Sequence, residues 1–206
     1  MTASVRLYCI SSIEDYSISA HSLFRVHSNA FPSAFITSLG CTFFSELLAS
    51  HLKIVGNYLL VARCYGSIVG YSLVGKDPGV FAIFKSLGLV SSLQCLCFSL
   101  FNNPFRFFSH SVYYLLFSKR HSFVHFKRTS FTHLRSIAVD SKCQNLGIGS
   151  SMLEYIKNKS TTSIVLDCVK GSPEFSFYLK HGFFLISSYR DLAFRSMCKL
   201  QCFPSP

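Results

Sequence analysis

The pattern of apolar positions divides the chain into short strands and helices. Continuous or alternating apolar runs predict strands, and apolar positions that repeat every three or four residues predict helices. Strands are expected at about residues 5–10, 57–63, 67–74, 133–139, 162–169, 183–187 and 191–200. Helices are expected at about residues 11–27, 39–52, 80–101, 105–118, 150–159 and 172–180. The order strand, loop, helix, strand, helix, strand from residue 133 onward indicates an α/β or α+β domain with at least one parallel crossover.

The segment from about residue 76 to 131 has a different pattern. It is rich in Phe, Leu and Ser, and Asn102-Asn103-Pro104 separates its two predicted helices. Residues 80–101 come closest to a membrane-spanning segment, which needs about 20 mostly apolar residues. Because Lys85, Gln94 and several Ser residues interrupt this stretch, we prefer a buried or interfacial helix and keep a membrane span as the alternative.

The composition indicates a folded, basic protein. A length of 206 residues fits a single domain over residues 1–206, and 50% apolar residues exclude a disordered chain. The net charge of +11 favours an anionic partner such as nucleic acid, acidic lipid or a phosphorylated small molecule. Between Pro78 and Val139 the chain has no Asp or Glu. The basic residues of that stretch are Lys85, Arg106, Lys119, Arg120, Lys127, Arg128 and Arg135.

The cysteine and histidine residues do not form a metal-binding pattern. The nine Cys are scattered, odd in number and without a CxxC pair, so we expect free thiols in a reducing compartment. His121 and His125 have a metal-compatible spacing, but no third ligand accompanies them, and no metal is predicted. The first twenty residues lack the continuous apolar core of a secretory signal, which favours a cytoplasmic protein.

The most informative segment is the loop that follows the predicted strand at residues 133–139. Gln144-Asn145-Leu146-Gly147-Ile148-Gly149 leads into the predicted helix at 150–159. A helix N-terminus offers unpaired N–H groups and a positive dipole end, and glycines allow a phosphate to approach the backbone. The third glycine of a Rossmann fingerprint and the Gly-Lys-Ser/Thr of a P-loop are both missing. A tight turn without a ligand is the alternative interpretation.

Two motifs resemble the GNAT superfamily of acyl-CoA-dependent N-acetyltransferases. The loop residues Gln144 to Gly149 match the family's coenzyme A loop, [QR]-x-x-G-x-[GA]. Phe177-Tyr178-Leu179-Lys180-His181-Gly182-Phe183 is similar to the F-Y-x-x-x-G-F segment at the end of the family's last helix. The resemblance is good over residues 133–184, looser over 1–75 and absent over 76–131. It implies a mixed central sheet flanked by helices, with a largely helical hydrophobic insertion before the coenzyme-binding strand.

The resemblance also implies how the co-substrate acetyl-CoA is bound. The backbone of Ile137, Ala138 and Val139 would pair with the pantetheine arm. The pyrophosphate would lie against the loop and the start of the helix, at Gln144, Asn145, Leu146, Gly147, Ile148, Gly149 and Ser150. In the family, the acceptor amine attacks the thioester directly in a ternary complex. Gly171 stands where many members carry an Asn that contacts the pantetheine arm, so that contact is expected to be missing.

Two residues are candidates for acid and base. Tyr178 matches the family position that protonates the departing thiolate, and a phenol with a pKa near 10 suits that role. His133 occupies the strand position where members often place the base. A tyrosine of the core and a polar histidine at a strand end are the respective alternatives.

The acceptor and the role of the basic segment stay open at this stage. Arg128 and Arg135 are expected to help bind an anionic acceptor, such as a nucleotide-linked amino sugar. The alternatives are a solvated basic face, peripheral attachment to a membrane surface through residues 78–139, and nucleic-acid binding on a degenerate fold. Nucleic-acid binding is not expected, because no recognisable nucleic-acid-binding motif is present. The Phe-rich, charge-poor insertion also suggests a homodimer.

Overall fold

The structure is a computed structural model that describes residues 5–11, 19–102, 104, 131–190 and 196–204. Its elements in chain order are β1 (Val5–Ile10), α1 (Ala20–Ala30), α2 (Phe35–Leu52), β2 (Tyr58–Cys64), β3 (Ser67–Val74), α3 (Val80–Asn102), β4 (Thr132–Val139), a 3₁₀ turn (Ser141–Cys143), α5 (Ile148–Lys159), β5 (Ile164–Val169), α6 (Pro173–Lys180), β6 (Phe184–Arg190) and β7 (Ser196–Cys202). The strands form one mixed sheet in the order β1-β2-β3-β4-β5-β7-β6.

The strand predictions are confirmed with shifted ends, and residues 191–195 of the last predicted strand lie outside the described residues, whereas two helix starts were wrong. Helix α1 begins at Ala20, after its N-cap Ser19, and not near residue 11; residues 12–18 lie outside the described residues. Helix α2 begins at Phe35 and bends at Gly40, where φ is 84°. The first helix of the 76–131 segment is α3, and the predicted helix at 105–118 lies outside the described residues.

The hairpin between β2 and β3 follows directly from its turn sequence. Tyr65 and Gly66 are the two turn residues, with φ of 49° and 78°. Positive φ at both central positions makes a type I′ turn, whose twist matches that of the flanking strands. Cys64 therefore pairs with Ser67, and β2 and β3 form the centre of the antiparallel half of the sheet.

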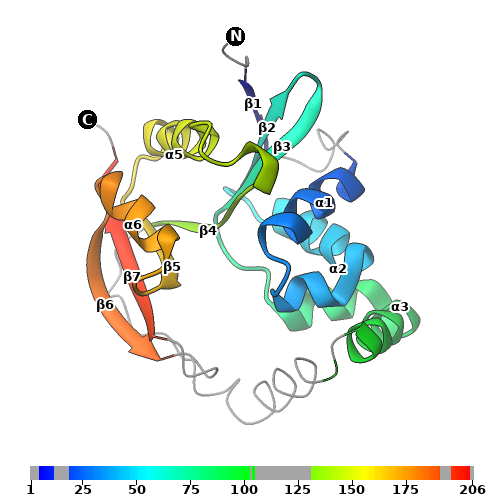
Figure 1. Cartoon of the computed structure of the whole chain (residues 1–206). Helices are drawn as coiled ribbons and strands as arrows, with labels where there is room; N and C mark the ends of the chain where they lie inside the picture. The colour runs from blue at the N-terminus through cyan, green and yellow to red at the C-terminus, as the bar shows by residue number, and fades with distance from the viewer. Residues whose placement is uncertain (1–4, 12–18, 103, 105–130, 191–195, 205–206) are drawn as a thin grey trace.

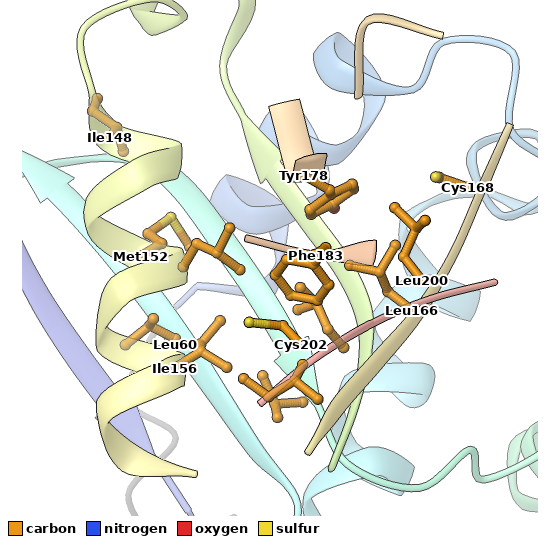
Figure 2. Packing of buried hydrophobic residues seen from close by; sticks show 14 of the residues in the cluster. Leu60, Ile148, Met152, Ile156, Leu166, Cys168, Tyr178, Phe183, Leu200 and Cys202 are labelled. Carbon is orange, nitrogen blue, oxygen red and sulfur yellow. The ribbon is translucent and has the colours of Figure 1, made fainter. Parts of the chain in front are cut away.

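Helices cover the two faces of the sheet separately (Figure 1). Helices α1 and α2 pack on one face, with α3 outside α2, while α5 packs on the other face. The alternation along β2 shows this division, since Leu59 and Val61 contact the α1–α2 side and Leu60 and Ala62 the α5 side. Figure 2 shows the apolar core on the α5 side of the sheet, in which Met152 and Ile156 of α5 lie next to Leu60.

The two halves of the sheet meet at a very short parallel contact between β4 and β5. Only two residue pairs form it, Thr132 with Ile164 and His133 with Val165. Beyond these pairs, no pairing joins the remainder of β4 and β5, so the two strands separate toward their carboxyl ends. Ligands of open α/β sheets bind at such carboxyl ends. The opening between β4 and β5 is therefore the first place to look for a site.

Candidate functional site

The edge of β4 that faces this opening carries backbone groups that β5 does not pair. Asp140 donates its N–H to Val69 O on the β3 side, and Ala138 pairs opposite Tyr71 on the same side. Successive peptide groups of a strand point to opposite edges. Ile137 and Val139 therefore direct their N–H and C=O groups toward the opening. This edge can form hydrogen bonds with an extended ligand that has amide groups, as it would with a neighbouring strand.

The loop after β4 is ordered by its own side chains. Asp140 Oδ1 accepts the N–H of Lys142 at 3.1 Å, so this carboxylate caps the 3₁₀ turn. Gln144 Nε2 donates to Val139 O at 3.2 Å and ties the loop back to the strand. Asn145 and Gly147 have φ of 61° and 78°, and these left-handed conformations turn the chain into α5.

The N-terminus of α5 presents unpaired backbone donors. The first bond within the helix runs from Ser151 N to Gly147 O, which leaves the N–H groups of Ile148, Gly149 and Ser150 without an acceptor in the helix. The N-cap residue is Gly147, so no side chain caps these groups, and the first turn contains no acidic residue. Together with the helix dipole, three free N–H groups favour a phosphate or pyrophosphate at this position.

A groove between α5 and the end of α6 continues from this helix terminus. It encloses a volume of about 320 Å³ and is lined by Ser150, Glu154, Lys157 and His181. Lys157 Nζ donates to His181 O at 3.1 Å. Sequence analysis missed Glu154, Lys157 and His181 as site residues. The spacing of Ser150, Glu154 and Lys157 by four and three positions, which places them on one helix face, was the available signal.

Tyr178 lies on α6, on the same face of the sheet as α5. The helix is capped by Ser172, whose Oγ accepts the N–H of Phe175 at 3.2 Å, and Pro173 occupies its first turn. The Tyr178 side chain is buried next to Cys168 of β5 and Phe183 (Figure 2). Burial raises the pKa of its phenol, and the neighbouring Cys168 and Glu174 raise it further. The hydroxyl therefore keeps its proton at neutral pH.

His133 lies at the closed end of the opening, on the opposite face from Tyr178. Its neighbour Leu134 packs into the α5 core, so His133 points to the other side of the sheet. His133 Nε2 lies 3.4 Å from Asp167 Oδ2, and Tyr189 donates to Asp167 Oδ1 at 3.0 Å. Burial alone would raise the pKa of Asp167, but the bonds from His133 and Tyr189 and the charge of Lys199 lower it. Asp167 therefore stays ionised and holds the imidazole.

The two arginines predicted to bind the acceptor have different outcomes. Arg128 lies outside the described residues. Arg135 forms an ion pair with Asp77, with 2.7 Å between Nη1 and Oδ2. Arg135 also borders a small cavity of about 50 Å³ between α1, α2, β3 and β4, together with His27, Tyr71 and Ser136. The ion pair uses one N–H of a guanidinium that has five.

Comparison with solved structures identifies the architecture. No family model and no curated protein matches the sequence. An acetyltransferase assigned to the GNAT family from Desulfovibrio desulfuricans superposes with a TM-score of 0.58 and 14% identity over 98% of this chain and 100% of that one. A GNAT acetyltransferase from Bacillus cereus gives a TM-score of 0.57 and 11% identity, with coverage of 98% and 99%.

The chain has the GNAT fold. A PaiA N-acetyltransferase from Thermoplasma acidophilum in complex with coenzyme A has a TM-score of 0.50 and 12% identity, with 95% and 98% coverage. The predicted fold class, a mixed sheet flanked by helices of GNAT type, is confirmed. Since all these identities are low, the likeness establishes the GNAT fold and leaves the activity to be argued from the site.

Proposed function

We propose that the protein is an acetyl-CoA-dependent N-acetyltransferase. One observation carries this proposal: the edge of β4 at Ile137 and Val139, which β5 does not pair, leads directly to the uncapped N-terminus of α5. A ligand with an extended amide-bearing arm that ends in a pyrophosphate fits these groups, because the strand edge can bond the amides and the helix N–H groups can bond the pyrophosphate. Coenzyme A has that chemistry, and the N-acetyltransferase of the same fold from Thermoplasma acidophilum carries coenzyme A.

Each part of acetyl-CoA has a proposed place. The pantetheine arm pairs with the backbone of Ile137 to Val139, and the pyrophosphate accepts from the N–H groups of Ile148 to Ser150. The predicted loop residues Gln144, Asn145, Leu146 and Gly147 then shape the site more than they contact it, since Gln144 is bonded to Val139 O. The groove at Lys157 and His181 is open to the remaining, phosphate-bearing part of the nucleotide.

The two titratable candidates lie on opposite faces of the sheet at this opening. The amine attacks the thioester carbonyl, so a C–N bond forms and the C–S bond breaks. His133, whose Nε2 faces Asp167, has Nδ1 as the proton acceptor of its neutral ring and takes the proton of the attacking amine directly or through water. Tyr178, kept protonated by burial, gives its proton to the departing thiolate. The reaction needs no covalent enzyme intermediate.

We further propose that the acceptor amine belongs to an anionic molecule, such as a nucleotide-linked amino sugar. The acid-free stretch from Pro78 to Val139 ends in β4, and Lys199 adds positive charge beside Asp167. Arg135 keeps free N–H donors for a second anion besides Asp77. Changing Arg135→Gln is expected to raise the KM of a phosphate-bearing amine about tenfold, one charge-assisted contact being lost, without changing that of a neutral amine. Arg6→Gln, on the distant strand β1, is the matched control.

A thermal-shift titration tests the coenzyme site. Acetyl-CoA and coenzyme A are expected to raise the unfolding midpoint in a saturable way, because both bind the folded state only. Gly147→Glu places a negative charge at the helix N-terminus and is expected to abolish the shift. Gly56→Glu is the control, since Gly56 has a similar φ of 87° and lies before β2, near the opposite end of β4 from the loop. A folded protein with no shift would contradict the proposal.

A further inference from the structure

Helix α3 carries large apolar residues on both its inward and its outward side. The inward side carries the buried Ile83, Cys95 and Ser99 and packs the partly buried Phe84, Leu87 and Leu96 against the core. The outward side carries large apolar residues, of which Phe101 is 85% and Leu89 76% exposed. The exposed apolar residues of this outward side are Leu89, Val90, Leu93 and Phe101, and Phe98 lies at its border with α2. A surface helix in water normally shows polar and charged residues on its outward side.

The inward side of α3 is a specific contact with α2. Ser99 Oγ lies 2.9 Å from Ser38 Oγ, and both residues are buried. A Cβ on Gly40 would come within 3.3 Å of the Phe98 ring, so the absence of a side chain at Gly40 lets the two helices approach. Ile83 anchors the first turn in the core. The inward side of α3 is therefore fully used by these contacts and by apolar packing, such as that of Phe84 on Phe43, whereas the bulky groups of its outward side have no such packing.

The length and composition of α3 would allow it to lie in the hydrocarbon of a membrane, whereas its packing against α2 does not fit a membrane-spanning helix. Among the described residues it is the one helix long and apolar enough to cross a membrane, with a mean hydropathy of 1.5 over Ala82–Asn102 and 17% of the window buried. A spanning helix would have to leave α2 and expose Ser99. A helix that keeps one face on the protein and offers the other to lipid lies along the membrane surface.

The charge around α3 favours a membrane surface with anionic lipid. Lys85 is exposed on the helix, and no acidic residue occurs between Asp77 and Asp140. The whole chain carries a net charge of +11. An interfacial helix with adjacent Lys and Arg binds anionic headgroups, each basic residue near the surface adding to the attraction. Neutral lipid offers the apolar contact alone.

We propose that the outward side of α3 docks on the surface of an anionic lipid bilayer. Leu89, Leu93 and Phe101 enter the boundary between headgroups and acyl chains. The exposed Lys85 of the same helix then contacts the anionic headgroups. The proposal is independent of the proposed acetyl transfer, since α3 contributes no residue to the opening between β4 and β5.

Vesicle co-sedimentation of the full chain tests the docking. Binding to vesicles of phosphatidylcholine with phosphatidylglycerol is expected to exceed binding to phosphatidylcholine alone and to weaken with added salt. Leu89→Gln with Leu93→Gln is expected to lower the partition coefficient at least about tenfold, because both exposed leucines leave the lipid contact. Phe203→Gln, at an exposed apolar residue on the far half of the sheet, is the control and is expected to bind as the parent does.

The lack of Trp in the chain allows a second measurement. Phe101→Trp and Phe203→Trp each introduce a single indole at an exposed Phe. With anionic vesicles, the emission of the Phe101→Trp variant is expected to shift to the blue and to be quenched by brominated lipid, whereas that of the Phe203→Trp variant stays unchanged. Both variants are expected to keep the unfolding midpoint of the parent, so a difference in emission does not reflect misfolding.

Three results would overturn the proposal. The first is a parent that binds neither kind of vesicle. The second is equal vesicle binding by the parent and the double glutamine variant. The third is a parent that stays off vesicles and forms a dimer in sedimentation equilibrium, lost in the double variant, which would assign the outward side of α3 to a second copy of the chain.

Discussion

His133 Nε2 lies 3.4 Å from Asp167 Oδ2, directly beside the two residue pairs that hold β4 and β5 together. The contact joins the two strands at the point where their separation begins, and it places an oriented imidazole at the closed end of the proposed thioester site. Asp167 accepts a second bond from Tyr189, so the carboxylate is held from two sides. A carboxylate that bonds to one ring nitrogen in this way fixes the orientation of an imidazole that acts as a base.

Replacing the two members of this pair should affect turnover differently. His133→Gln is expected to lower kcat by about 100-fold, because it removes the proposed proton acceptor. Asp167→Asn is expected to lower kcat about tenfold with an unchanged KM for acetyl-CoA, since it alters only the orientation of the ring. His21→Gln, at an exposed histidine of α1, serves as the control. Steady-state kinetics with unchanged kcat in His133→Gln would exclude the assigned role.

The lowered pKa of Asp167 makes a prediction about stability. Its folded pKa lies below the ordinary value of 3.8, because the bonds from His133 and Tyr189 and the charge of Lys199 outweigh burial. The ionised carboxylate therefore stabilises the fold above about pH 4, and this contribution disappears as the pH falls through the folded pKa. Urea unfolding of Asp167→Asn should differ from the parent at pH 7 and converge with it as the pH falls through the folded pKa of Asp167. A difference independent of pH would contradict this.

Tyr178→Phe separates chemistry from binding. The ring stays in the same packing against Phe183, so the midpoint of thermal unfolding and the KM for acetyl-CoA should change little. The loss of the proton donor should lower kcat by about 100-fold. Since burial raises the pKa of this phenol, kcat of the parent should not fall up to about pH 10 through ionisation of Tyr178. A lowered unfolding midpoint with unchanged kcat would indicate a purely structural tyrosine.

The buried His27 should make the fold sensitive to mild acid. Its Nδ1 lies 2.6 Å from Tyr71 Oη, its Nε2 has no partner among the described residues, and burial lowers its pKa to about 4. The unfolded state then binds a proton below about pH 6.5 that the folded state refuses until about pH 4. Stability should fall by about 3 kcal/mol over this window. His51, also buried with a lowered pKa, adds to the loss in the same direction.

The part due to His27 is measured by comparison with a variant. His27→Gln should flatten the dependence of the unfolding free energy between about pH 6.5 and 4, whereas the exposed His21→Gln on the same helix should leave it as in the parent. Urea titrations at several pH values decide between these outcomes. A parent whose stability is constant down to about pH 4 would show that His27 is protonated at little cost.

Elements whose signal is local could be predicted from the sequence. Tyr65 and Gly66 define the β2–β3 turn, and Gly147 before α5 defines the start of the helix, because the conformation of each depends on its immediate neighbours. The start of helix α1 was predicted too early, at about residue 11. Helix α1 begins at Ala20 without a side-chain cap and without an acidic residue in its first turn, so the usual local signals of a helix start are missing there.

The sequence by itself determined the glycine-bearing loop before α5 and the order of strands and helices after β4, and it suggested His133 and Tyr178 as candidates. Only the tertiary structure decided that Asp167 faces His133, that Lys157 and His181 border one groove, and that α3 leaves large apolar residues such as Leu89 and Phe101 exposed. The physical reason is the range of the interactions. Turns and helix ends are fixed by backbone geometry within a few residues, whereas strand register and helix orientation follow from contacts between distant segments that no local pattern encodes.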